Sequence, residues 1–153
     1  MTVKVSITAD PKGERALKQL LELDGRAARA GLFTPEMAMR GAGNEFGTGR
    51  IPSRPWASTA ADNGAPALAA LAEREIGALA DGRGSAGDVL EEFGETMADS
   101  LRSIILDGEV PGPPLAASTI ARKGHDRKLI DTGEMVGSIT HTIGAAEEAD
   151  DDA

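Results

Sequence analysis

Residues 129–134 contain the side chains whose types and spacing are best suited to catalysis. An aspartate follows two apolar residues and precedes threonine and glycine. Two such aspartates sharing one proton can activate water and protonate a leaving group, and a dimer can supply the second aspartate. This chemistry would be acid–base hydrolysis of a peptide bond. The six residues of this motif are Leu129, Ile130, Asp131, Thr132, Gly133 and Glu134.

The same motif also has a purely structural interpretation. Asp131 can cap a short helix through Thr132, Gly133 and Glu134, with Glu134 reaching back toward the cap. Aspartic proteases are nearly all β, whereas this chain is predicted to be largely helical. They also carry a small residue at the position of Glu134, and a three-residue match is a short motif. We therefore expect a structural motif and no enzyme, and keep an aspartic protease built on Asp131 as the alternative.

Other kinds of reactive site find little support. The chain has no cysteine, which excludes disulfides, zinc fingers and thiol nucleophiles, and it has only two histidines. The carboxylates lack the spacing of metal ligands. The glycines at 41, 43, 47 and 49 match neither the phosphate-binding loop nor the dinucleotide-binding motif. We expect no catalytic residue, no metal and no cofactor.

One basic cluster surrounds His125 and either is a solvated loop or contacts an acidic or phosphate-bearing partner. The second histidine, His141, lies on the apolar side of a predicted strand, which favours a core histidine over a ligand. The cations of the cluster are Arg122, Lys123, Arg127 and Lys128.

Composition narrows the function classes further. The 153 residues are 41% hydrophobic and 27% charged, as expected for one soluble globular domain. Aromatic residues make up 3% and the net charge is −9, which argues against stacking on bases and gripping phosphates. The sequence has no long apolar run and no signal-peptide-like start, so we expect no contact with a membrane. Five acidic residues fall within 147–153, so we expect a single domain over 1–146 and a disordered acidic tail over 147–153.

The first third of the chain predicts two strands and one helix. Residues 3–8 alternate apolar and polar side chains, which is typical of a strand. Asp10-Pro11 predicts a helix start, and Gly31 a helix end. The apolar face of this helix would contain Leu17, Leu20, Leu21 and Ala28. A short second strand is predicted over 36–42.

The rest of the chain predicts helices and one closing strand. A helix begins near Trp56, and Pro66 either kinks it or starts a new one. Ser85 and Asp88 form a capping pair for a helix that ends at Gly108, and 115–123 is a further short helix. Residues 138–143 alternate again. The expected fold class is therefore α+β, with a small, mainly antiparallel sheet and helices packed on one face.

The Gly- and Pro-rich loop over 43–55 ends beside the single tryptophan of the chain. Gly47 permits backbone shapes closed to other residues, while Pro52 and Pro55 stiffen the exit. Arg54 suits a bidentate carboxylate, and Trp56 beside it is typical of an interface anchor. On these physical grounds, a loop packed on its own helix is equally well supported.

Two segments of the sequence resemble the neck proteins of long-tailed bacteriophages, the small tail-completion or head–tail joining proteins. The first is Asn-Glu-Phe-Gly-Thr followed by Ile-Pro-Ser-Arg-Pro-Trp over 44–56, where the family usually has Phe in place of Trp56. The second runs from Pro113-Pro114-Leu115 through Thr119-Ile120 and Lys123-Gly124 to the motif at 129–134 and Ser138-Ile139. The first 40 residues match in pattern only, and the acidic tail is not part of the family signature.

The resemblance implies a structural virion protein, assembled in the host cytoplasm, that completes the tail or joins it to the head. It implies a tail-terminator-like ring, commonly of six copies, that contacts neighbouring neck and tail-tube proteins while DNA passes through without specific recognition. A head-closure or tail-tube protein is the alternative virion component. The expected interface residues are Asn44, Glu45, Phe46, Gly47, Ile51, Pro52, Arg54, Pro55 and Trp56.

Overall fold

The computed structural model describes residues 10–146, which form an α+β fold of helices and a two-stranded antiparallel sheet, as the sequence predicts. The predicted strand over 3–8 and the acidic tail lie outside these residues. Along the chain the elements are α1 (Pro11–Leu23), β1 (Arg26–Gly31), α2 (Pro35–Glu45), α3 (Trp56–Ala80), α4 (Ala86–Leu106), α5 (Ala117–Lys123), α6 (Glu134–Gly137) and β2 (Thr140–Ala145).

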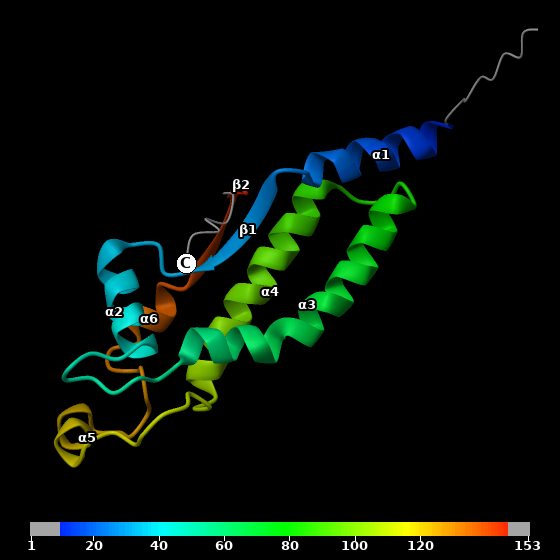
Figure 1. The fold of residues 1–153 in the computed structure, drawn as a ribbon. Helices are drawn as coiled ribbons and strands as arrows, with labels where there is room; N and C mark the ends of the chain where they lie inside the picture. The colour runs from blue at the N-terminus through cyan, green and yellow to red at the C-terminus, as the bar shows by residue number, and fades with distance from the viewer. Residues whose placement is uncertain (1–9, 147–153) are drawn as a thin grey trace, which may run out of the picture.

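A hairpin of the two longest helices, α3 and α4, forms the centre of the fold (Figure 1). Ser85 caps α4 as predicted, because its hydroxyl accepts a hydrogen bond from the Asp88 backbone N–H at 3.2 Å. Pro66 lies inside α3 rather than at the start of a new helix. Since proline removes one backbone hydrogen bond, it accounts for the bend in α3 visible in Figure 1.

The sheet lies against α4 and pairs the first strand of the described chain with the last. Ala28 pairs with Ile143 and Ala30 with His141, so these four side chains share one face of the sheet. That face meets α4 at Gly94, where an added Cβ would lie 2.5 Å from the His141 ring. The alternation predicted for the closing strand is confirmed by its burial pattern.

The predicted helix from Pro11 to Gly31 is wrong in its second half. The helix ends at Leu23, Gly25 turns the chain with a φ of +67°, and 26–31 form β1. Alanine and arginine favour helix locally, but pairing with β2 overrides that propensity. The predicted apolar face is also wrong, since Leu17 and Leu21 are exposed and Ala16 is buried.

The predicted strand over 36–42 is also wrong, because these residues lie within α2. Pro35 occupies the first helical turn, where its missing N–H costs nothing. The buried residues Met37 and Gly41 are four apart, which is the spacing of a helix face and not of a strand. The predicted loop therefore begins only after Glu45.

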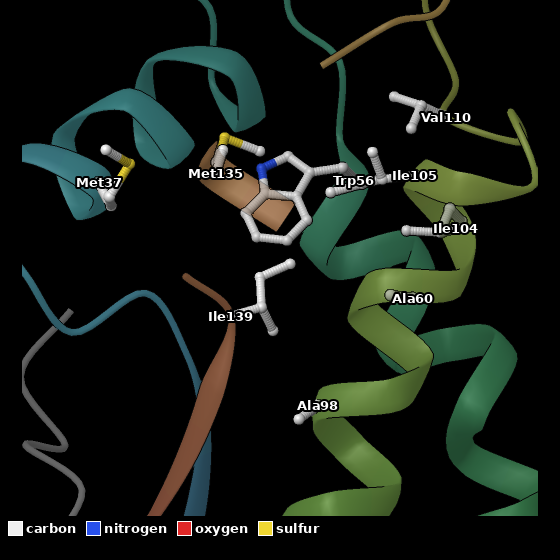
Figure 2. Close-up of a cluster of buried hydrophobic side chains, with 9 residues drawn as sticks. All are labelled: Met37, Trp56, Ala60, Ala98, Ile104, Ile105, Val110, Met135 and Ile139. Carbon is white, nitrogen blue, oxygen red and sulfur yellow. The ribbon is translucent and has the colours of Figure 1, made fainter. Parts of the chain in front are cut away.

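The main core gathers around Trp56, at the end of the hairpin nearest α2 and α6 (Figure 2). The indole lies between Met135 of α6 and Ile139, with Ile105 of α4 on its other side. Other buried members are Met37, Ala60, Ala98, Ile104 and Val110. In this way the first residue of α3 joins four elements of the fold. No helix within residues 10–146 has the length and apolar character needed to span a membrane.

Candidate interaction site

The two sequence segments that carry the resemblance lie together at one end of the molecule. The loop that follows α2, the connector that follows α4, α5 and α6 all gather there in Figure 1. A single cavity is lined by both segments. We call residues 44–56 and 110–135 the motif end.

The loop over 46–55 is locked by its own hydrogen bonds. The Thr48 N–H donates to the Ile51 carbonyl at 2.7 Å, and the Ile51 N–H donates to the Thr48 hydroxyl at 3.0 Å. Gly47 has a φ of +76°, and an added Cβ would lie 2.8 Å from the backbone nitrogen of Ser53. Only glycine fits there without strain, which explains the Phe-Gly-Thr sequence. The loop is thus a fixed structure.

The end of α2 holds both the loop and the start of α3. The Arg54 N–H donates to the Asn44 carbonyl at 2.6 Å. The Glu45 carboxylate accepts from the Ala57 N–H at 2.8 Å and from the Ser58 hydroxyl at 2.6 Å. A carboxylate at the N-terminus of a helix satisfies free N–H groups and interacts favourably with the helix dipole. Asn44 and Glu45, both expected at the interface, therefore have contacts inside their own chain.

Trp56 fills a pocket of its own chain, which corrects the hypothesis that it anchors a partner. Its side chain is 4% exposed, and the indole N–H donates to the Gly41 carbonyl at 3.1 Å. A Cβ at Gly41 would lie 3.2 Å from the indole and 2.7 Å from Leu32. The interpretation in which the loop packs on its own helix is right for this residue. Pro55 precedes it, half-buried.

Arg54 is also buried, at 6% exposure, and has few partners. One terminal nitrogen donates to the Pro113 carbonyl at 3.4 Å, and Nε has no hydrogen-bond partner. Gly112 lets the connector pass closely, since a Cβ there would lie 2.6 Å from the Ser53 carbonyl oxygen. Among residues 10–146, no carboxylate forms the ion pair that was expected for Arg54.

The cavity beside Arg54 has a volume of about 660 Å³. Its charged lining consists of five cations and one carboxylate, Asp131. Its apolar lining includes Ile51, Pro52, Leu115, Leu129 and Ile130. The cations are Arg40, Arg50, Arg54, Arg122 and Lys123.

Asp131 forms an ion pair with Arg122 and does not cap a helix. Its Oδ2 accepts from Arg122 at 3.0 Å, and its side chain is 56% exposed. Gly133, with a φ of +84°, precedes α6, and the Glu134 N–H donates to the Thr132 hydroxyl at 3.3 Å. The predicted cap is therefore wrong, because Gly133 is the N-cap of α6 and has no side chain to accept a hydrogen bond. Within its own chain, the neighbour of the Asp131 carboxylate is therefore the Arg122 guanidinium.

The side chains of the basic cluster mostly donate hydrogen bonds to backbone carbonyls. Lys128 donates to the carbonyls of Val110 and Gly112, both at 2.8 Å, and Lys123 donates to that of Arg127 at 2.7 Å. Burial lowers the pKa of Lys123, and the charges of Arg122 and Arg54 lower it further, while Asp131 raises it. The cluster therefore organises the connector and also leaves positive charge inside the cavity.

His141 is a partly buried histidine with a hydrogen bond to its own chain, as predicted. Its Nε2 lies 2.8 Å from a Glu91 carboxylate oxygen, and its ring lies on Gly94. Residues 10–146 contain no cluster of three or more His, Cys, Asp or Glu side chains that could hold a metal ion.

Two large apolar side chains of α2 and its end are exposed. Met39 is 77% and Phe46 79% exposed, and they are seven residues apart, so they lie on one face of the helix. Ile51 in the loop is 40% exposed. The sequence motif pointed to Phe46 and Ile51 but missed Met39, whose seven-residue spacing from Phe46 was the available signal.

Comparisons of the chain with protein-family models, with curated proteins and with solved structures found no match. The sequence motifs and the geometry of the motif end are therefore the basis for a functional proposal.

Proposed function

We propose that this protein is a structural component of a tailed bacteriophage or prophage. It completes the tail or joins it to the head at the neck, as a ring through which DNA passes. One observation carries the proposal: the two segments that resemble neck proteins, 44–56 and 113–139, are far apart in the sequence, but residues of both line the same cavity. A shared motif that builds one surface region supports a shared role in assembly.

The structure of the motif end suits a permanent contact between subunits. A heterologous ring needs one patch to meet a different patch on the next copy, with the same geometry each time. The hydrogen bonds of Thr48 and Glu45 hold the loop and the end of α2 in one conformation. A preformed surface loses little conformational entropy on binding.

The contact surface in this proposal is the exposed face of α2 with Met39 and Phe46. Large apolar side chains that lie together on a surface mark interaction sites more often than scattered ones do. Trp56 is buried against α2 behind this surface and does not touch the next subunit. Thus the motif contains exposed residues (Phe46, Ile51 and Pro52) and buried or half-buried supports.

Rings formed by the purified protein test this assignment by electron microscopy and sedimentation. We expect closed rings for the unchanged chain and their loss in the double variant Met39→Ser, Phe46→Ser. The matched control is Leu17→Ser, Leu21→Ser, which removes two exposed leucines from α1. Rings that persist in the first variant, or are lost only in the control, would contradict the proposed surface. A monomer at every concentration would contradict the ring itself.

Passage of DNA gives a second test. An acidic chain repels phosphate, so we expect no measurable binding of duplex DNA near physiological salt. Fluorescence anisotropy with a labelled duplex measures this. Micromolar binding that weakens steeply with salt would instead indicate a protein that grips the nucleic-acid backbone.

A further inference from the structure

The cavity of the motif end contains positive charge that its own chain does not neutralise. Arg122 pairs with Asp131, and Arg40 pairs with two glutamates outside the cavity lining. Within residues 10–146, Arg50, Arg54 and Lys123 have no carboxylate within ion-pair distance. This excess of cations lies in a chain whose net charge is −9.

Arg54 is the strongest sign that a ligand is missing. Its guanidinium is always charged, and a buried charge without a partner is costly. The single carbonyl that it reaches is 3.4 Å away, a long hydrogen bond, and Nε has no acceptor at all. A carboxylate entering the cavity can accept from both nitrogens in the bidentate geometry that arginine favours.

The surroundings of Arg54 favour a carboxylate on a polypeptide over duplex DNA. The walls include Ile51, Pro52 and Leu115, so a side chain that enters also contacts apolar surface. Burial lowers the pKa of Lys123, Asp131 raises it, and the nearby charges of Arg122 and Arg54 lower it, as expected for cations that line one cavity. An anion that enters relieves this repulsion.

We propose that this cavity binds the acidic segment 147–152 of a neighbouring copy of the chain; the presence of that neighbour rests on the proposed ring. The segment has the required chemistry, with five carboxylates and one alanine in six positions. Its side chains are short, and the cavity of about 660 Å³ has room for several of them. The segment has five carboxylates and the cavity lining has five cations and one carboxylate, so their charges are complementary.

The direction of β2 carries the end of the described chain away from the cavity. The strand begins beside α6 at the motif end and runs to Ala145, which pairs with Arg26 near α1 (Figure 1). Six strand residues cover about 20 Å at roughly 3.3 Å per residue. A chain that leaves one copy away from its own cavity and binds in the cavity of the next copy makes a head-to-tail contact, the type that closes into rings.

Two charge-neutral variants of the full chain test the proposal by sedimentation velocity over a concentration series. The segment variant is Glu147→Gln, Glu148→Gln, Asp150→Asn, Asp151→Asn, Asp152→Asn, and the cavity variant is Arg50→Gln, Lys123→Gln. Arg54 is left in place because it also packs inside the fold. Each variant should weaken self-association about tenfold or more, and their combination no more than either alone, since both remove one contact. The control Lys12→Gln, Lys18→Gln removes two exposed cations from α1 and should change nothing.

Reversal of both charges sharpens the test. We expect a chain with Arg50→Glu and Lys123→Glu to lose self-association. Replacing the five acidic residues of the segment by lysine in that same chain should restore it. Far-ultraviolet circular dichroism establishes that each variant is folded. If the segment variant self-associates as strongly as the unchanged chain while the cavity variant self-associates more weakly, the proposal is overturned, because another acidic group then occupies the cavity. Rings that form normally in both variants would also overturn it and leave the proposed function intact, whereas a wild-type chain that never associates would count against the ring itself.

Discussion

The hairpin of α3 and α4 and the motif end are held together in different ways. In the hairpin, small residues let the helices pack closely, as where Gly64 of α3 meets Ser100 of α4, and burial stabilises the contact. The motif end depends on single hydrogen bonds, on glycines with positive φ, and on arginine contacts. A distributed interface tolerates change at one position better than a region in which each residue has its own partner.

The strongest test of this difference is Trp56→Ala, at the point where the two regions meet. Loss of a buried tryptophan leaves a cavity and removes the hydrogen bond to the Gly41 carbonyl, so the free energy of unfolding should fall by about 3–5 kcal/mol. Urea unfolding followed by circular dichroism measures it. Phe46→Ala is the control, and because its side chain is exposed it should change stability by about 0.5 kcal/mol or less. Equal effects of the two variants would contradict the buried position of Trp56.

A second test compares two glycines of the hairpin. In Gly94→Ala the new methyl group meets the His141 ring at 2.5 Å, so the sheet must shift and stability should fall by about 1–3 kcal/mol. Gly77→Ala faces open space in α3 and should raise stability by about 0.5–1 kcal/mol through helix propensity. Thermal unfolding of both variants shows the sign. A stabilising Gly94→Ala would mean that β2 does not pack on α4 at this point.

At the motif end, Glu45→Gln removes the charge that faces the start of α3. Glutamine keeps the shape but binds the free N–H groups less strongly, so we expect a loss of about 1 kcal/mol. Glu95→Gln on the exposed side of α4 is the matched control and should be nearly neutral. If both variants unfold at the same urea concentration as the unchanged chain, the carboxylate is not a cap.

The smallest expected effect concerns the pKa of Lys123, which burial and neighbouring cations lower from its ordinary 10.5. The folded state then binds fewer protons than the unfolded state between the two pKa values. Stability should therefore rise with pH across the window just below 10.5. Asp131 raises this pKa, so Asp131→Asn should lower it further, as lysine side-chain NMR can measure. A higher pKa in that variant would contradict the placement of Asp131 beside the cavity.

Local signals in the sequence predicted the elements that local interactions determine. Ser85 and Asp88 marked the start of α4, and the alternation after Gly137 marked β2. The strand β1 could not be predicted in this way. Its Arg-Ala-Ala-Arg-Ala sequence has helical propensity, and it is extended because β2, distant in sequence, supplies the hydrogen bonds.

The candidate site was predicted in part. The motif located the correct region, but Arg54 and Trp56 were expected to face a partner, and both are buried. A large aromatic or an arginine is chemically suited to an interface and to a core, and only the path of the chain decides between them. Gly41 decides it here, because its missing side chain leaves the space that the indole fills. Met39 was not noticed because its segment was predicted as a strand.

The pairing of β1 with β2 has a consequence for the order of folding. It joins the first and last strands of the described chain, down to the Ala146 N–H that donates to the Gly25 carbonyl at 2.8 Å. Closing so long a loop costs chain entropy before the hydrogen bonds of the strand pair can stabilise it. The hairpin of α3 and α4 has only a short connection to close, so it should form early and present α4 as a surface for the strands. The sheet is then the last part of the fold to form and the first to open.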